Sequence, residues 1–314
     1  MPEWVVERGI GETRFALLEG EEIVEARILL DGVLPAGSIV DARLVSVGTN
    51  GRNAVAVTPD GTELLLPHRP AGTTEGARLS LEIAREAIPG IEPWKRPLAR
   101  PPAQEHRTSE ASARPATPGE LDRTGWLDLL DEAATGLIDF PGGQLRLSLT
   151  PAMSLFDVDG SLPPDQLAVA GARAAAAAIR RLGIGGSIGI DLPTTHGKAP
   201  RAAAAAAIDG ALAGVPFERT AVNGFGFVQI VRPRRHASLP ELYAGDRPAA
   251  EARALLRRAG THVGGLTIAA HPAVIAVLDD RAEWTGQLAR HVGGAVALRS
   301  DPRLAMSAGH AEPR

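Results

Sequence analysis

The hydrophobic pattern divides the chain into a β-rich first third and an α/β remainder. Apolar residues recur in two short runs, 13–18 and 23–28, on either side of a Gly-containing turn, which predicts a β-hairpin. From residue 37 to about residue 86, several further short runs are separated by Gly, Asn and Pro. Short strands at this spacing, punctuated by turn signals, predict a small antiparallel barrel.

The pattern disappears between residues 93 and 120, where Pro, Arg, Ala, Ser, Thr and Glu dominate. A segment of this composition buries too little apolar surface to offset the entropy that ordering would cost it. We therefore expect a flexible linker there, and it is the clearest domain boundary in the sequence.

Beyond the linker, strand-length apolar runs alternate with Ala-rich helical stretches. The predicted elements are helices at 121–136, 164–182 and 200–213 and strands at 143–149, 153–159, 187–191 and 228–231. Strands and helices that alternate in this way favour a sheet with at least partly parallel order. A last α/β segment, 249–304, carries strands at 266–269 and 295–298, and we expect a frayed tail from residue 305.

Composition and charge narrow the function classes. The chain has 314 residues, 44% hydrophobic and 22% charged, which is typical of a globular protein with room for two domains and a connector. The net charge of −4 excludes a globally basic nucleic-acid coat, so any phosphate contact must come from local Arg clusters. The absence of Cys excludes disulfides and thiolate-bound zinc and fits a reducing cytosol.

Membrane and secretory segments are not expected. No apolar stretch reaches the roughly 18–20 residues that a membrane helix needs, because the longest candidate is broken at His271-Pro272. The N-terminus has no basic region followed by an apolar run, so we see no secretory signal and expect a cytoplasmic protein.

Carboxylates end two of the predicted strands. Asp157 and Asp159 close one strand and Asp191 closes the next, with one helix between them, so a crossover connection would set the two strands side by side or nearly so. Carboxylates this close repel unless a cation neutralises them, and Mg²⁺, which prefers oxygen ligands, would do so. Such an ion could polarise a phosphodiester and activate a water. The ordinary alternative is that these residues are helix caps or loop residues, with Asp159-Gly160 a turn.

Four short motifs, in this order, resemble the catalytic core of the ribonuclease E/G family. Residues 140–160, which include Phe140-Pro141-Gly142-Gly143 and Phe156-Asp157-Val158-Asp159-Gly160, are similar to the family's PSGG strand and its IDVNSG motif. The other three are residues 182–191, similar to GGLIVIDFIDM; residues 223–234, similar to SRFGLLEMSRQR; and Ala270-His271-Pro272 with residues 298–304, similar to the HP and ADPxL motifs of the family's small domain.

The resemblance, which covers residues 137–304, implies an α/β (α+β) protein in which an OB-like barrel is joined to an RNase H-like core and a small C-terminal α/β domain. The implied divisions are 1–35, an N-terminal hairpin that packs on the catalytic core; 36–92, the OB-like RNA-binding barrel; 93–120, the linker; 121–236, the core; 237–304, the small domain; and 305–314, the tail.

The resemblance also implies an activity: Mg²⁺-dependent cleavage of single-stranded RNA, in RNA processing or decay. Asp157 and Asp191 would hold the metal as catalytic residues. Asp159 would be a third catalytic residue, because it replaces the family's Asn, which helps to position the scissile phosphate. An additional carboxylate at this position could either tighten the binding of the metal or repel the phosphate.

Two basic groups are candidates for RNA phosphate contacts. Arg232, Arg234 and Arg235 follow a predicted strand, and as phosphate contacts they would position RNA without reading its sequence. Lys198 and Arg201 lie just beyond Asp191. The alternatives are a solvated strand end for the first group and a solvated helix start for the second.

Several departures from the family keep a second interpretation open, a catalytically weak RNA-binding or assembly protein. Thr194 replaces the second Asp of IDFIDM, and Gly224 replaces an Arg that helps to sense the RNA 5′ end. No aromatic residue lies between Phe15 and Trp94, and Val55 and Leu65 stand about where the family carries phenylalanines. Without Cys, a zinc-linked tetramer is not expected, although a homodimer is allowed for. A nuclease acting on DNA or hybrids is the third alternative.

Overall fold

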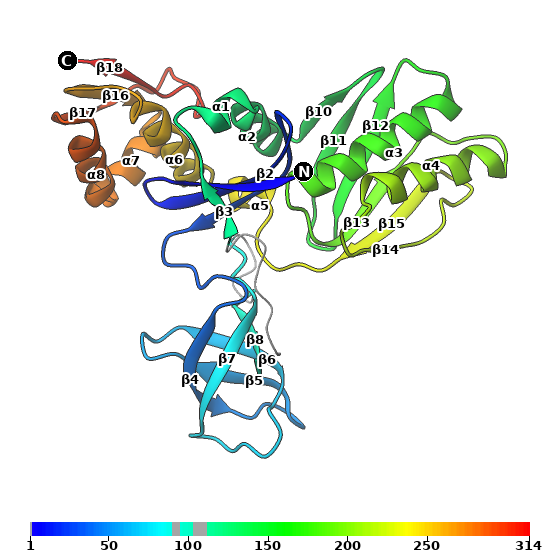
Figure 1. Ribbon diagram of the computed structural model, residues 1–314, viewed down its shortest axis with the longest axis horizontal. Coiled ribbons are helices and arrows are strands. Elements are labelled where there is room, and N and C mark those ends of the chain that lie inside the picture. The colour runs from blue at the N-terminus through cyan, green and yellow to red at the C-terminus, as the bar shows by residue number, and fades with distance from the viewer. Residues whose placement is uncertain (1, 90–94, 103–111) are drawn as a thin grey trace.

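The computed structural model of the protein describes residues 2–89, 95–102 and 112–314 (Figure 1). Within these ranges the chain forms a four-stranded sheet, a closed five-stranded barrel, a six-stranded sheet and a three-stranded sheet. The mixed α/β class and the barrel predicted from the sequence are therefore confirmed. No helix in the described ranges is long and apolar enough to cross a membrane.

The N-terminal sheet contains the predicted hairpin and two further strands. β2 (Glu12–Glu19) and β3 (Glu22–Leu30) form the hairpin, β1 (Glu3–Arg8) pairs antiparallel with β2, and β9 (Arg114–Pro115) pairs parallel with β1. Buried side chains of this sheet, among them Val5 and Ala26, belong to the same hydrophobic cluster as the α/β core. The hairpin thus packs on the core rather than on the barrel.

The barrel is closed by a strand that lies inside the expected linker. Its order is β4 (Ile39–Ser46), β5 (Arg52–Val57), β6 (Glu63–His68), β8 (Leu98–Arg100) and β7 (Arg78–Arg85). Ala99 is fully buried in an interior built only from Leu, Ile and Ala. β8 removes the open edge between β6 and β7, so pairing with both neighbours stabilises a segment that shows no hydrophobic period of its own.

The prediction of a flexible linker over residues 93–120 is therefore wrong at residues 98–100 and 114–115, which are strands. Ion pairs rather than burial hold the second of these. Arg114 binds Glu120 at 2.6 Å and Glu3 at 2.9 Å, and so ties β9 to the first turn after it and to β1. The remaining part of the expected linker, residues 103–111, lies outside the described residues.

The six-stranded sheet carries the predicted acidic strand ends. Its order is β10 (Leu137–Phe140), β11 (Gly143–Leu149), β12 (Ser154–Gly160), β13 (Gly186–Asp191), β15 (Phe227–Arg232) and β14 (Glu218–Arg219). β12 and β13 are parallel, and the other neighbours in this sheet are antiparallel. α3 (Pro164–Arg181) connects the parallel pair.

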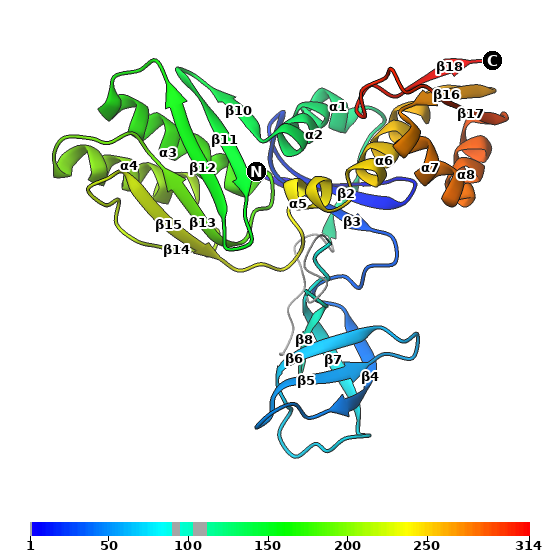
Figure 2. The ribbon, with the colours of Figure 1, turned by 180° about the vertical axis from the view of Figure 1, so that it is seen from behind.

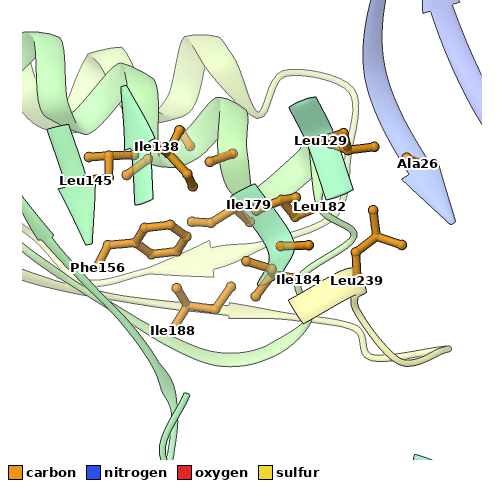
Figure 3. Close-up of a cluster of buried hydrophobic side chains, with 14 of the residues drawn as sticks. Ala26, Leu129, Ile138, Leu145, Phe156, Ile179, Leu182, Ile184, Ile188 and Leu239 are labelled. Atoms are coloured by element: carbon orange, nitrogen blue, oxygen red, sulfur yellow. The ribbon is translucent and has the colours of Figure 1, made fainter. Parts of the chain in front are cut away.

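Two Ala-rich helices, α3 and α4 (Lys198–Ala211), cover one face of this sheet (Figure 1), and Figure 2 shows the molecule from the other side. Apolar side chains of alternate strand residues fill the space beneath the helices. Phe156 and Ile188 lie close to Ile179 and Leu182 in this layer (Figure 3). The opposite face of the sheet carries Asp157, Asp159 and Asp191, which are exposed, together with Leu155 and Gly189, which are not.

Four helices connect this core to the small C-terminal domain. They are α1 (Glu120–Arg123), α2 (Trp126–Thr135), α5 (Leu239–Gly245) and α6 (Arg247–Ala259). Ala250 and Ala254 of α6 belong to the main hydrophobic cluster, whereas Leu255 and Leu256 belong to the second one. α6 is therefore shared by the two cores.

The small domain is a three-stranded sheet with two helices of its own. It contains β16 (Leu266–Ala270), α7 (Pro272–Asp280), α8 (Ala282–Val292), β17 (Val296–Ser300) and β18 (His310–Pro313). The expectation of a frayed tail from residue 305 is wrong, because β18 pairs antiparallel with β16. An edge strand of four residues gains its stability from this pairing, which no local pattern announces.

A buried ionic network holds the N-terminal sheet against α6. Glu12 accepts hydrogen bonds from Arg14 at 2.6 Å and from Arg253 at 2.8 Å. Glu7 accepts from Arg14 and from Arg257, both at 2.7 Å. Arg14 is only 1% exposed, so these pairs are screened little by solvent. Burial by itself raises the pKa of Glu7, but the hydrogen bonds and charges of Arg257 and Arg14 more than offset this and lower it below its usual value.

The network predicts a pH-dependent contribution to stability. Replacing Glu7 with Gln is expected to lower the free energy of unfolding at pH 7 by about 1–3 kcal/mol, because the buried Arg14 and the half-buried Arg257 each lose one of their two charged partners. Since the pKa of Glu7 is lower in the folded state, this contribution is present at neutral pH and is lost as the pH falls below about 4.5. Urea unfolding at pH 7 and at pH 4 would measure a smaller difference from wild type at the lower pH.

The matched control is Glu312→Gln, which removes a pair with Arg299 in which both side chains are 48% exposed. This substitution is expected to cost less than about 0.5 kcal/mol. An equal cost for the two variants would contradict the role given to the network.

Candidate active site on the open face of the sheet

Asp157 and Asp191 lie directly opposite each other on neighbouring strands. They are register partners in the parallel pairing of β12 with β13, and adjacent strands are about 4.8 Å apart. The preceding partners, Phe156 and Ile190, are fully buried under the helices, so the two aspartates project from the opposite, open face. Both side chains are exposed. The two acidic strand ends are therefore adjacent in space, as their spacing predicts.

The helix layer fixes this register. Phe156 and Val158 are both buried on the helix side of β12. At Gly171, α3 approaches β12 so closely that a Cβ atom there would lie 2.3 Å from Cγ1 of Val158. A glycine is required at this crossing, and it lets the helix seal the apolar side of the strand. Because strand side chains alternate, sealing this side leaves Asp157 and Asp159 on the open side.

The protein does not neutralise the carboxylate pair by itself. Among the residues that the structure describes, no ion pair and no hydrogen bond reaches the side chain of Asp157 or Asp191. Two carboxylates with free oxygen atoms match the donor set that Mg²⁺ takes from proteins, since this ion usually binds one or two carboxylates and completes its shell with water and phosphate oxygens. The residues present therefore fit Mg²⁺.

Asp159 does not join the pair as a third ligand. It lies two residues further along β12, opposite Gln144, whose side-chain amide donates to Asp139 at 2.8 Å. In the described part of the chain, no group of three or more His, Asp or Glu side chains could hold a metal ion. A metal at this edge would thus be held by Asp157 and Asp191 alone.

Arg146 of β11 is a neighbour of the pair that the motifs do not indicate. It is the register partner of Asp157 on the side away from Asp191, and its side chain is exposed. No ion pair of Arg146 is found with any described residue. The alternation of Leu145, Arg146 and Leu147 could have placed it on the open face, but only the register of β11 against β12 sets it beside Asp157.

A tight turn beside Asp191 carries Phe225, which sequence reasoning also missed. The side-chain oxygen of Asn223 accepts hydrogen bonds from the backbone N–H groups of Phe225 at 2.9 Å and Phe227 at 3.0 Å. Thr194, the residue that stands in place of a family Asp, donates from its hydroxyl to the Phe225 carbonyl at 3.3 Å. Phe227 is the register partner of Asp191. Phe225 itself is 83% exposed.

The structure does not bring the predicted RNA-binding arginines to the carboxylate pair. Arg232 pairs with Gly186 at the other end of β13, five residues or about 17 Å from Asp191. Its Nη1 donates to the carbonyls of Ile179 at 3.1 Å and Ile184 at 3.0 Å, and so satisfies the end of α3. Arg234 forms an ion pair with Glu241. Arg235 follows them on the same segment, at that same distant end of the sheet.

Lys198 and Arg201 belong to the helix layer. They lie in the first turns of α4, which follows Asp191 after a short loop. A cavity of about 940 Å³ is lined by α3 and α4 residues in this same layer, on the reverse of the sheet from Asp157 and Asp191. That cavity is not part of the candidate site.

Comparison with known proteins gives no relative. No protein-family model matches the chain, and no curated protein matches it. What the site can do has to follow from its own residues.

The carboxylate pair predicts a stability change that depends on Mg²⁺. Without divalent ions, Asp191→Asn is expected to raise the free energy of unfolding by about 0.2–1 kcal/mol, because it removes a like charge from directly opposite Asp157 and leaves Arg146 in place opposite Asp157. At a Mg²⁺ concentration ten times its dissociation constant, the wild type gains about 1.4 kcal/mol, and the variant gains much less. Thermal unfolding in EDTA and in Mg²⁺ measures both effects.

The control is Asp279→Asn, an exposed position near the end of α7 in the small C-terminal domain. This variant should respond to Mg²⁺ as the wild type does. If an Asp157→Asn, Asp191→Asn double variant were stabilised as strongly as the wild type, the ion would bind elsewhere.

Proposed function

We propose that this protein is a Mg²⁺-dependent endoribonuclease that hydrolyses single-stranded RNA. The observation that carries the proposal is the register pairing of Asp157 with Asp191 on an exposed sheet face, where neither side chain forms an ion pair or a hydrogen bond with a described residue. The motif resemblance to the ribonuclease E/G family supports the same two residues. The OB type of the barrel, the RNase H-like nature of the core and a cytoplasmic location are parts of this proposal.

Each residue near the pair has a role in the proposed hydrolysis. Mg²⁺, when bound, would polarise the scissile phosphate and lower the pKa of a bound water. Asp157 and Asp191 would hold the ion by their carboxylates. Arg146, on the other side of Asp157, can donate charge-assisted hydrogen bonds to a phosphate oxygen. The phosphate would thus lie over β11, β12 and β13, with Arg146 on one side and the ion-binding carboxylates on the other.

The barrel supports RNA binding through charge rather than stacking. Val55 and Leu65 are cross-strand partners on its outer surface, where aliphatic side chains offer no π-face to a base. Arg43 and Arg78 are also cross-strand partners, and both are exposed. Two like charges placed side by side create a local positive patch, which favours a polyanion and makes binding sensitive to salt.

A catalytically weak RNA-binding protein is the second candidate. The specific observation that favours it is Asp159, whose exposed carboxylate lies on the same face as the proposed phosphate site and would repel a phosphate. This candidate predicts RNA binding that survives the loss of both aspartates, without any Mg²⁺-dependent product.

A cleavage assay separates the two candidates. With Mg²⁺, the wild type is expected to cut single-stranded RNA internally, and the Asp157→Asn, Asp191→Asn double variant should be slower by about 10³-fold or more, because metal-ion catalysis supplies several kcal/mol. Fluorescence anisotropy in EDTA should show that the double variant still binds RNA. Single-stranded DNA and RNA–DNA hybrids complete the substrate panel.

The Asp279→Asn variant serves again as the control and should cut at the wild-type rate. Equal cleavage by the wild type and the double variant would place the chemistry elsewhere. Salt-sensitive binding by the wild type without cleavage would establish the second candidate.

Arg146 gives an independent test of where the phosphate lies. Arg146→Gln is expected to raise KM by about tenfold or more, because a charge-assisted hydrogen bond to the phosphate is lost, and Arg146→Lys should recover part of this. The control is Arg173→Gln, an exposed arginine of α3 on the reverse of the sheet. Steady-state cleavage kinetics measure the effect, and equal KM values for the Arg146→Gln and Arg173→Gln variants would rule out the assigned role.

A further inference from the structure

The side chain of Phe225 is exposed to solvent on a turn whose backbone is held by hydrogen bonds. It is 83% exposed, and in the described ranges it is the only aromatic among the large hydrophobic side chains that are exposed. A single exposed apolar residue is ordinary by itself. Here the exposed ring is carried by a turn that Asn223, Leu192 and Thr194 all contact.

Hydrogen bonds and a close backbone approach hold the turn in place. Asn223 accepts two backbone hydrogen bonds, one on each side of Gly226. Gly226 has a φ of +96°, and a Cβ atom there would lie 2.1 Å from the carbonyl oxygen of Leu192, so the turn presses directly against the segment that follows Asp191. Thr194, from that same segment, bonds the Phe225 carbonyl. The ring is therefore presented from a fixed backbone.

The turn lies on the side of the carboxylate pair opposite Arg146. Across the open face, the register gives the order Arg146, Asp157, Asp191 and Phe227. The Phe227 ring lies over Gly189, where an added Cβ atom would be 2.7 Å from Cζ of Phe227. Phe225 precedes the start of β15 by two residues and extends beyond that strand end into solvent. A cation thus lies on one side of the aspartates and aromatic rings lie on the other.

We infer that Phe225 is a stacking platform for a nucleobase of single-stranded RNA, next to the phosphate held at Asp157 and Asp191. The inference rests on the proposed function and names the part of the substrate that this turn would bind. In single-stranded RNA the bases are free to unstack onto aromatic side chains. Phenylalanine has no polar group, so it binds any base by its π-face without reading sequence. In a duplex the base is not accessible to the ring.

The first experiment measures stacking without cleavage. RNA oligonucleotides that carry 2-aminopurine at one position each are mixed, in EDTA, with the Asp157→Asn, Asp191→Asn double variant. We expect quenching of 2-aminopurine fluorescence at one or two neighbouring positions, and loss of that quenching when Phe225→Ala is added. Quenching that persists in the Phe225→Ala background would overturn the inference.

The second experiment uses the active protein and substitutions of graded chemistry. Phe225→Ala and Phe225→Leu are expected to raise KM by about 5- to 100-fold with a smaller change in kcat, whereas Phe225→Tyr should stay near wild type, because stacking needs a ring. An abasic nucleotide at the quenched position should weaken binding to the wild type as much as the Phe225→Ala substitution does. It should cause no additional loss of binding in the Phe225→Ala variant. A Phe225→Leu variant as good as wild type would mean that the contact is only apolar and would overturn the inference.

Val263→Ala is the matched control, because Val263 is 92% exposed on a loop before β16 and belongs to neither site. It should bind and cleave as the wild type does. Phe225 does not pack in the hydrophobic core, so the midpoint of thermal unfolding of its variants should match that of the wild type. Cleavage with normal kinetics in Phe225→Ala would reject the stacking platform and leave the nuclease standing, whereas quenching without any cleavage would do the reverse.

Discussion

Two negative charges held side by side are the constraint around which the α/β core is arranged. Like charges directly opposite each other weaken a sheet, and Asp157 and Asp191 are in that position. Packing on the reverse of the same strands outweighs the repulsion, because Phe156 and Ile190 are fully buried beneath the helix layer. A slip of either strand by one residue would turn its carboxylate into that layer, so the apolar side fixes the register and with it the charge pair. The repulsion is thus maintained at an exposed edge, where a cation from solution can relieve it.

The order of the strands explains why the neighbours of the pair differ in chemistry. β11 contributes Arg146 on one side of the aspartates, and β15 contributes Phe227 and the turn of Phe225 on the other. A nucleotide has the same sequence of properties, an anionic phosphate at one end and an aromatic base at the other. The order of charged and aromatic side chains across the open face, perpendicular to the β-strands, therefore matches the order of phosphate and base in a nucleotide. The barrel, with Arg43 beside Arg78, adds charge at a distance and no aromatic surface.

The sequence was informative where one local period decides the structure. The alternation in β12 and the apolar run of β13, with an Ala-rich helix between them, predicted the adjacency of Asp157 and Asp191. It failed where pairing or charge decides: β8 exists because Ala99 closes the barrel, and β18 because β16 offers an edge. Residues that are close in sequence also misled. Arg232 and Arg234 form a basic cluster in the chain, yet the fold uses one to satisfy the end of α3 and the other to pair with Glu241. Arg146 and Phe225 depend on register and on a turn, which composition does not encode.

The position of Asp159 decides between the two effects that an additional carboxylate could have. The backbones of Asp157 and Asp191 are about 4.8 Å apart across neighbouring strands, whereas Asp159 is about 6.6 Å further along β12 from Asp157. Asp159 is opposite Gln144 rather than Asp191, so it is not a cross-strand partner of the pair and would not share its ion. In the proposed hydrolysis its charge would act on the substrate and not on the metal, and Arg146, opposite Asp157 on the neighbouring strand, is the group that would compensate it. The balance between these two side chains, more than the affinity of the ion, would set how closely a phosphate can approach the site.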